Sequence, residues 1–153
     1  VGLDAARFFF LMHSPDSHMD FDLELAKERS AKNPVYYVQY AHARVASIFK
    51  KAEGAKPDSK KTDLLVTDEE KGLIKKLIRF PEAVEDTARD YQVIRLTRYA
   101  TELARAFHDF YEKHRVITDD KELTGARLAL AEATQIVLQN TLGLLGVSAP
   151  EKM

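Results

Sequence analysis

Tyrosine and arginine side chains share one face of the stretch 33–51, which reads NPVYYVQYAHARVASIFKK. Tyr37, Tyr40 and Arg44 follow one another at intervals of three and four residues, the spacing of neighbours on an α-helix. Aromatic rings stack on unpaired nucleotide bases, and a guanidinium binds phosphate or lies over a ring. Half-buried packing with wet hydroxyls, beside a solvated arginine, produces the same pattern. Spacing alone leaves both interpretations open.

A long helix must position these side chains. Asn33 is a good N-cap, and Pro34 stands in the first turn, where its missing N–H costs nothing. A stripe of apolar residues runs along the next face at alternating spacings of three and four: Val38, Ala41, Val45, Ile48 and Ala52. Such a stripe is typical of a core-facing helix, so the row of tyrosines and arginine is expected at the boundary between core and solvent.

A second long helix, predicted over 94–115, repeats this arrangement. Its core-facing row is Leu96, Tyr99, Leu103, Phe107, Phe110 and His114. A neighbouring row contains Ala104, His108, Tyr111 and Arg115. An aromatic residue and a cation are therefore again expected together at the margin of the core.

The remaining pattern predicts an all-α helical bundle. Further helices are expected over 3–13, 23–31 and 68–79, from Pro81, and over 122–145. Thr67 and Glu70 form a capping box before the helix at 68. The stretch 53–63 mixes Gly, Pro, Ser, Asp and Lys and predicts an exposed loop. The last helix is expected to turn its Leu130, Ala133, Val137, Thr141 and Leu144 inward and to end at Gly146 as the C′ residue.

Composition excludes several classes of function. The chain of 153 residues contains no cysteine, so thiolate catalysis, thiolate metal sites and disulfides are excluded. A net charge of −1 argues against a sequence-blind polyanion binder, so any nucleic-acid recognition must come from a local surface. No apolar run approaches the roughly 18 residues of a membrane span.

The residues offer no sign of a reaction centre. None of the five histidines lies in an HExxH or Glu-x-x-His motif, so no metal ligands are predicted. The six glycines form no phosphate-binding loop, and no serine lies in a nucleophile motif. We expect no catalytic residue, no metal site and no cofactor in this chain.

Three long stretches resemble arginyl-tRNA synthetases: NPVYYVQYAHARVASI at 33–48, RLTRYATELARAFHDFYEKHRV at 95–116, and LTGARLALAEATQIVLQNTLGLLGVSAPEKM at 123–153. The opening VGLDAARFFFLMHSPDSHMDFD resembles the segment that follows the catalytic domain in that family. The resemblance covers nearly the whole chain and is weakest over 53–66. It implies the C-terminal part of a class I synthetase, with a DALR-type anticodon-binding helical-bundle domain.

The resemblance also implies where the domains begin and end and which partners they bind. Residues 1–18 are expected to be the end of the catalytic and connector region, and residues 19–153 the anticodon-binding domain. The expected partners are the anticodon loop of arginine tRNA and the catalytic domain of the same cytoplasmic enzyme, with no membrane or DNA partner. The HIGH and KMSKS signatures are absent from the sequence, so ATP and Mg²⁺ are expected in the parent catalytic domain, and this part is expected to be inactive alone.

The family's tRNA contacts correspond to particular residues of this chain. Tyr37, Tyr40 and Arg44 match tRNA-contacting positions, and Tyr111 matches a position that stacks on an anticodon base. Arg115 stands where some members carry tryptophan, so its role is less secure.

The end of the chain adds one more expected contact. The family's terminal methionine approaches the anticodon loop, and this chain ends at Met153. Gln39 and His42 lie on another face of their helix and are expected to be structural or to bridge helices. The alternative function is a helical protein-interaction module that docks a partner on the same aromatic stripe.

Overall fold

The computed structural model describes residues 2–14 and 16–153, and the regular secondary structure in this part of the chain is entirely helical, without a strand. The elements are α1 Leu3–Leu11, α2 Leu23–Lys27, α3 Pro34–Lys51, the 3₁₀ helix η1 Ser59–Leu64, α4 Asp68–Ile78, α5 Phe80–Asp90, α6 Ile94–Lys113 and α7 Lys121–Leu144. The predicted all-α bundle is confirmed.

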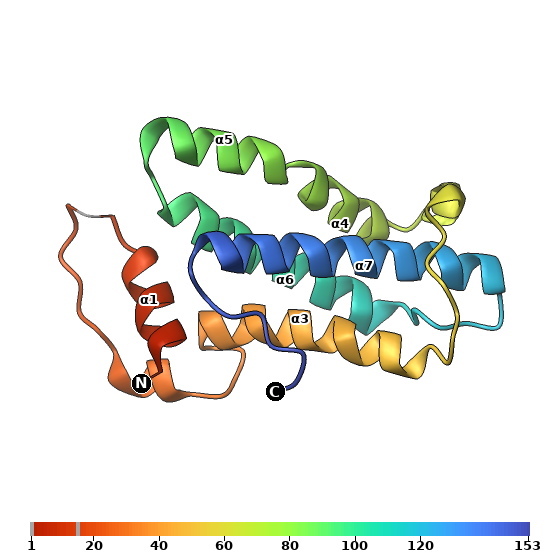
Figure 1. The fold of residues 1–153 in the computed structure, drawn as a ribbon, viewed down its shortest axis with the longest axis horizontal. Coiled ribbons are helices and arrows are strands. Elements are labelled where there is room, and N and C mark those ends of the chain that lie inside the picture. The colour runs from red at the N-terminus through yellow and green to blue at the C-terminus, as the bar shows by residue number, and fades with distance from the viewer. Residues whose placement is uncertain (1, 15) are drawn as a thin grey trace.

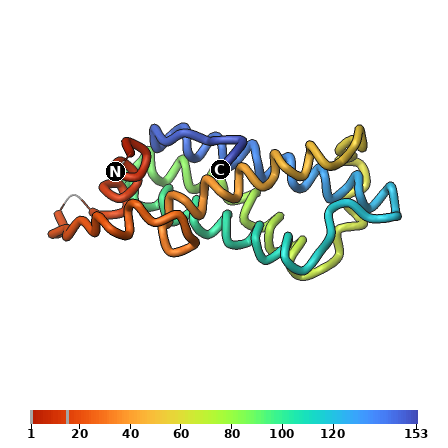
Figure 2. Tube along the Cα trace, turned by 90° about the horizontal axis from the view of Figure 1, so that it is seen from below, coloured from red at the N-terminus to blue at the C-terminus, as the bar shows by residue number. Residues whose placement is uncertain are grey.

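Three long helices form the body of this elongated molecule. Helices α3, α6 and α7 pack against one another along the long axis, as Figures 1 and 2 show. Helices α4 and α5 pack on α6, and α4 also reaches α7. Helix α1 lies at one end, against α2, α3 and α6. No described helix is long and apolar enough to cross a membrane.

Asn33 begins α3 as predicted and also ends α2. Its Oδ1 accepts the backbone N–H of Val35 at 3.2 Å, which is the expected N-cap bond. Its Nδ2 donates to the carbonyl of Ala26 at 3.2 Å and to that of Glu28 at 2.9 Å. Because these carbonyls are occupied from outside and Glu28 is extended, α2 ends at Lys27 and the prediction of a helix to residue 31 is wrong.

The predicted core face of α3 is confirmed. Val38, Ala41 and Val45 are fully buried, and Ile48 and Ala52 nearly so. The adjacent row containing Tyr37, Tyr40 and Arg44 is half-buried, which confirms the predicted position at the edge of the core.

The predicted inner face of α7 is partly wrong. Leu130 and Thr141 are buried, but Leu144 is 55% exposed and Ala133 and Val137 are only partly covered. The buried row is Ala131, Thr134, Leu138, Thr141, Leu142 and Leu145. Thr134 and Thr141 tolerate burial because their hydroxyls donate to carbonyls one turn back, at 2.8 and 2.7 Å. Apolar residues surround most of this helix, so the sequence pattern does not select one face.

The region predicted as a loop over 53–63 contains the start of η1. The carboxylate of Asp58 accepts the backbone N–H of Lys60 at 3.0 Å and begins this short helix. The N–H of Asp58 donates to the carbonyl of Gly125 in α7 at 2.9 Å. A Cβ on residue 125 would lie 3.1 Å from the Cβ of Asp58, so this close approach favours glycine.

The C-terminal tail, residues 146–153, folds back over α3 (Figure 1). Gly146 has a φ of +65°, as expected for a C′ glycine. Gln39 Nε2 donates to the carbonyl of Ser148 at 3.0 Å and to Asp4 at 2.9 Å, and His42 Nδ1 lies 2.9 Å from the carbonyl of Pro150. The prediction that Gln39 and His42 are structural bridges is therefore confirmed.

Candidate nucleic-acid interface

Side chains of α3 and α6 meet in what we call the aromatic cluster: Tyr37, Tyr40, Arg44, His108 and Tyr111. The guanidinium carbon of Arg44 lies 4.8 Å from the ring centre of Tyr40 and 5.0 Å from that of Tyr111. Its Nη1 donates to the Tyr111 hydroxyl at 3.4 Å. Cation–π contacts of this kind contribute about 0.5–1 kcal/mol each at exposed sites. One cation therefore links rings that come from two helices.

His108 of α6 packs against two tyrosines of α3, Tyr37 and Tyr40. Its ring centre lies 4.6 Å from that of Tyr37 and 5.8 Å from that of Tyr40, nearly parallel to the Tyr40 ring. Its Nε2 is buried without a hydrogen-bond partner among the described residues. Burial lowers the pKa of His108, and the positive charge of Arg44 acts in the same direction. The imidazole is therefore neutral at neutral pH.

Tyr37 is partly buried and packs against the hydrophobic core. Burial is the main cause that raises the pKa of its hydroxyl, and the carboxylate of Asp109 adds to the effect. The hydroxyl therefore stays protonated and available as a hydrogen-bond donor.

An open hollow lies beside the cluster, and we call it the tail hollow. Its volume of about 340 Å³ is within the usual range for small-ligand sites. It is lined by Tyr40, Ala43, Arg44, Ser47, Ile48, Lys51, Tyr111, Lys152 and Met153. Four of the six residues predicted to contact tRNA, namely Tyr40, Arg44, Tyr111 and Met153, are thus brought together. Lys51, which follows Arg44 on the same row of α3, and Lys152 of the tail add positive charge to this site.

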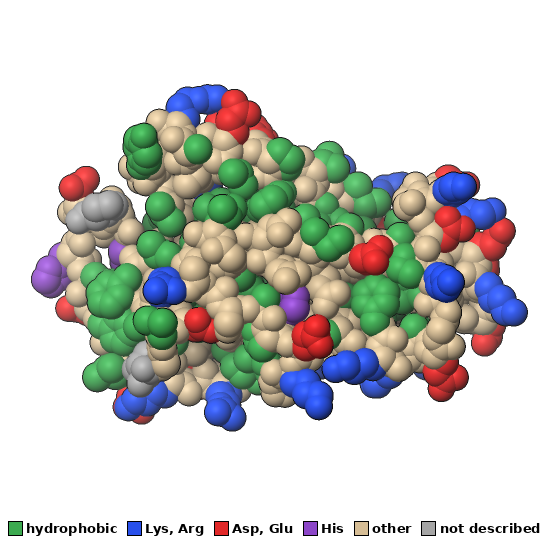
Figure 3. All heavy atoms as spheres, in the orientation of Figure 1, with side chains coloured by type: hydrophobic (Ala, Val, Ile, Leu, Met, Phe, Trp, Pro, Cys, Tyr) green, Lys and Arg blue, Asp and Glu red, His purple; other side chains and the backbone are tan. Residues whose placement is uncertain are grey.

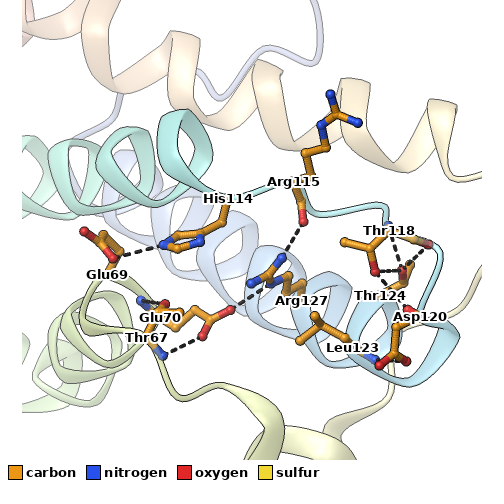
Figure 4. A network of polar contacts seen from close by, with 10 residues as sticks. All are labelled: Thr67, Glu69, Glu70, His114, Arg115, Thr118, Asp120, Leu123, Thr124 and Arg127. Carbon is orange, nitrogen blue, oxygen red and sulfur yellow. Dashed lines mark hydrogen bonds and ion pairs between the residues drawn. The ribbon is translucent and has the colours of Figure 1, made fainter.

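Arg115 is not part of this arrangement. The prediction placed it on the helix row of Tyr111, but α6 ends at Lys113 and His114 is extended, with φ −129° and ψ 132°. In Figure 4 the Arg115 side chain points away from the polar network that holds its carbonyl. The row of Ala104, His108 and Tyr111 therefore does not continue to Arg115.

A second polar assembly, the buried ion-pair network, explains where α6 ends. Arg127 of α7 donates through Nε to Glu70 at 2.7 Å and through Nη1 to the carbonyl of Arg115 at 2.7 Å (Figure 4). Glu70 is fully buried and also closes the predicted capping box with Thr67, which is confirmed. Burial alone would raise the pKa of Glu70, but hydrogen bonds from Thr67 and Arg127 outweigh it and lower the pKa.

The edge of the network is held by a second acid. Glu69 accepts from Lys113 at 2.6 Å and lies 3.0 Å from His114 Nε2. The hydrogen bond from His114 is the main cause that lowers the pKa of Glu69 to about 2, and the hydrogen bond from Lys113 adds to the effect. This acid thus ties the first turn of α4 to the last turn of α6.

The chemistry available here is stacking and ion pairing. No group of three or more His, Asp or Glu side chains in the described part of the chain has the arrangement of a metal site. Lysine and arginine side chains line the lower edge of the face shown in Figure 3, interspersed with acids. The sequence placed His108 on the row of Tyr111, but it did not predict the burial of His108, because that burial depends on packing between helices.

The chain is similar in sequence to proteins of one known family. Residues 38–153 match the family described as the DALR anticodon binding domain. The chain is 55% identical to the arginine–tRNA ligase of Geobacter metallireducens and 56% identical to that of Citrifermentans bemidjiense, in each case over 100% of this chain and 28% of the relative. It therefore spans little more than a quarter of the curated relatives it matches.

A solved structure extends the likeness to three dimensions. The arginyl-tRNA synthetase of Thermus thermophilus superposes with a TM-score of 0.84 at 34% identity, over 99% of this chain and 26% of that protein. The matched region includes α3, α6, α7 and the tail, which together build the aromatic cluster and the tail hollow. The chain belongs to the family of DALR anticodon-binding domains found in arginine–tRNA ligases.

Proposed function

We propose that this chain is the anticodon-binding part of an arginine–tRNA ligase and that it binds the anticodon loop of arginine tRNA at the aromatic cluster and the tail hollow. One observation carries the proposal. Arg44 lies between the rings of Tyr40 and Tyr111 at the edge of an open hollow that Met153 also lines. Aromatic faces beside cations suit unpaired bases and their phosphates.

Each part of the site has a separate task in this proposal. Bases of the loop stack on Tyr40 and Tyr111, each stacking contact contributing about 1–3 kcal/mol, while Tyr37 completes the surface from below. Arg44, Lys51 and Lys152 position phosphates and give binding its salt dependence. Base identity is read by hydrogen bonds to Watson–Crick edges, including those offered by backbone groups near Met153. Arg115 contacts the RNA outside the tail hollow.

The proposal extends to the longer protein. Residues 1–18 form the end of the catalytic and connector region, and residues 19–153 form the binding domain. ATP and Mg²⁺ belong to the catalytic domain. The sequence contains no HIGH or KMSKS signature, and the part of the chain that the structure describes contains no metal-ligand cluster. This part performs no chemistry alone, and its partners in the cytoplasm are arginine tRNA and its own catalytic domain, without membrane or DNA.

The alternative is a protein-interaction module that uses the same aromatic stripe. The family match and the cations around the tail hollow favour RNA over an apolar helix. Protein docking would also leave binding nearly independent of salt, whereas phosphate contacts weaken steeply as salt rises.

Binding to arginine tRNA, compared with a non-cognate tRNA at low and moderate salt, tests the proposal. We expect preference for arginine tRNA, loss of that preference when its anticodon is replaced, and weaker binding at moderate salt. Equal binding of both tRNAs, unaffected by the anticodon, would contradict a role in anticodon recognition.

A further inference from the structure

A second hollow lies on the other side of the C-terminal tail, between α1, the α2–α3 connection and the start of α3; we call it the α2 hollow. Its volume is about 560 Å³, within the range of ligand sites. Figure 1 shows the tail crossing α3 with α1 to one side of it. Lys27, Arg29, Tyr36 and Met153 are among the residues that line this hollow.

The two hollows share both a wall and an aromatic surface. Met153 lines each of them. Tyr36 lines the α2 hollow and Tyr40 the tail hollow, and their rings are nearly parallel, 10° apart in plane with centres 6.0 Å apart. Tyr36 and Tyr40 are one helical turn apart, so α3 presents an aromatic ring on each side of the end of the tail.

The acids of the α2 hollow are already engaged within the protein. Asp4 accepts hydrogen bonds from Gln39 Nε2 at 2.9 Å and from the N–H of Ser148 at 3.2 Å. Glu28 accepts the hydroxyl of Ser30 at 2.6 Å. These carboxylates hold the tail and the α2–α3 connection in place, and their side chains are therefore fixed by contacts within the protein, while Lys27 and Arg29 balance their charge.

The cations of the hollow are free by comparison. Arg29 is exposed and makes no ion pair with any residue that the structure describes. Lys27 has only a solvent-exposed partner, Glu24, at 3.5 Å. Such an exposed pair adds little stability, so exchanging it for a phosphate costs little. The hollow thus combines an aromatic face with two available cations, the same combination as the tail hollow.

We infer that the α2 hollow binds a second unpaired nucleotide of the same RNA strand, with its base on Tyr36, its phosphate near Arg29 and Lys27, and Met153 between it and the nucleotide in the tail hollow. The inference rests on the proposed function, because it takes the first nucleotide to lie on Tyr40 and Tyr111. The rings of Tyr36 and Tyr40 form one aromatic face that continues past Met153 from one hollow to the other. This continuity favours two nucleotides of one strand over an unrelated small ligand.

A cycle of protein and RNA variants tests the inference. This chain, with Tyr36→Ala, with Tyr40→Ala and unchanged, is titrated with the anticodon stem–loop of arginine tRNA carrying one abasic nucleotide at each loop position in turn. We expect Tyr36→Ala to weaken binding roughly 5- to 150-fold on intact RNA. One abasic position should abolish that loss, and a different position should abolish the loss caused by Tyr40→Ala.

The outcomes separate the two proposals. Loss with Tyr40→Ala but none with Tyr36→Ala overturns the second nucleotide site and leaves the proposed function intact. Loss with neither variant contradicts the proposed function itself. Dependence of both variants on the same abasic position means that one base spans both rings, which also overturns the second site.

Matched variants keep the test independent of folding. Tyr36→Phe retains the ring and should bind like the unchanged chain. Arg29→Ala, at an exposed side chain, should lower the slope of log affinity against log salt by about one. Arg89→Ala, on α5 and paired with Glu85, should not change that slope. An unchanged slope with Arg29→Ala would remove the phosphate contact from the inference.

Discussion

The aromatic cluster joins α3 to α6, and the buried ion-pair network joins α7 and α4 to the end of α6, yet the two regions treat charge in opposite ways. In the network, Arg127 contacts both the carboxylate of fully buried Glu70 and the carbonyl of Arg115. In the cluster, Arg44 makes no ion pair with a described residue and lies over two rings instead. His108 nearby keeps a buried nitrogen without a described partner.

The difference teaches what each region is built to do. Buried charges that satisfy one another hold elements in a single arrangement, because separating them leaves an uncompensated charge in the interior. A cation held by two ring faces and one long hydrogen bond to a hydroxyl keeps most of its N–H groups available to a ligand. The network therefore defines the shape of the molecule, and the cluster keeps groups available at its surface.

The largest effect is expected from breaking the network. Arg127→Ala leaves Glu70 buried and unpaired and should lower the free energy of unfolding by about 3–5 kcal/mol. Urea denaturation followed by circular dichroism measures it. The exposed pair of Arg89 with Glu85 provides the control, and Arg89→Ala should cost about 1 kcal/mol or less. Equal losses for the two variants would mean that the network does not hold the fold.

The next largest effect concerns Tyr40 in the cluster. Tyr40→Ala should weaken binding of arginine tRNA by about 1–3 kcal/mol, because a stacking surface is lost. Helical content should stay unchanged, since the ring is only half-buried. Tyr40→Phe, which retains the ring, should bind nearly as well as the unchanged chain. Unfolding of Tyr40→Ala would instead support the packing interpretation of the cluster.

A smaller effect separates the charge of Arg44 from its shape. Arg44→Lys keeps the positive charge but loses the planar group between Tyr40 and Tyr111, and should weaken tRNA binding by about 1 kcal/mol. The salt dependence of binding should be unchanged in Arg44→Lys and shallower in Arg44→Ala. Identical salt slopes for both variants would show that Arg44 does not meet phosphate.

The smallest expected effects are in the pH dependence of stability, and they fall in different windows for the two regions. The pKa of His108 is lowered by burial, so its contribution is complete above its ordinary value of 6.5 and is lost as pH falls below it. The pKa of Glu69 is lowered from 4.5 to about 2, so its contribution is lost only between those values.

Urea midpoints measured from pH 8 to pH 2 check these windows. His108→Phe should remove the decline that begins near pH 6.5 and leave the acid limb in place. Glu69→Gln should make the decline between pH 4.5 and about 2 shallower, because Glu70 still contributes to it, and should leave the decline near pH 6.5 unchanged. A single variant that changed both limbs would contradict the independence of cluster and network.

Much of the fold could be predicted because the signals that begin and end helices are local. Asn33 caps α3 because its side-chain oxygen accepts the backbone N–H of Val35, Thr67 and Glu70 close a capping box, and Gly146 takes a positive φ after α7. The core stripe of α3 is readable for the same reason: each buried residue follows the last by one helical turn. Tyr40, Arg44 and Tyr111 could thus be placed at the margin of the core.

Only the tertiary structure decided which of these side chains meet. Arg127 of α7 binds the carbonyl of Arg115 and helps to determine where that residue lies beyond α6, which separates Arg115 from Tyr111. Asn33 likewise ends α2 early by binding its carbonyls. The sequence by itself therefore determined most of the helices and the rows of residues along α3, because those depend on neighbours within a turn, but it did not determine the end of α2 or the buried face of α7. Contacts between residues far apart in the chain decided how the rows meet, because such contacts form only when the helices pack.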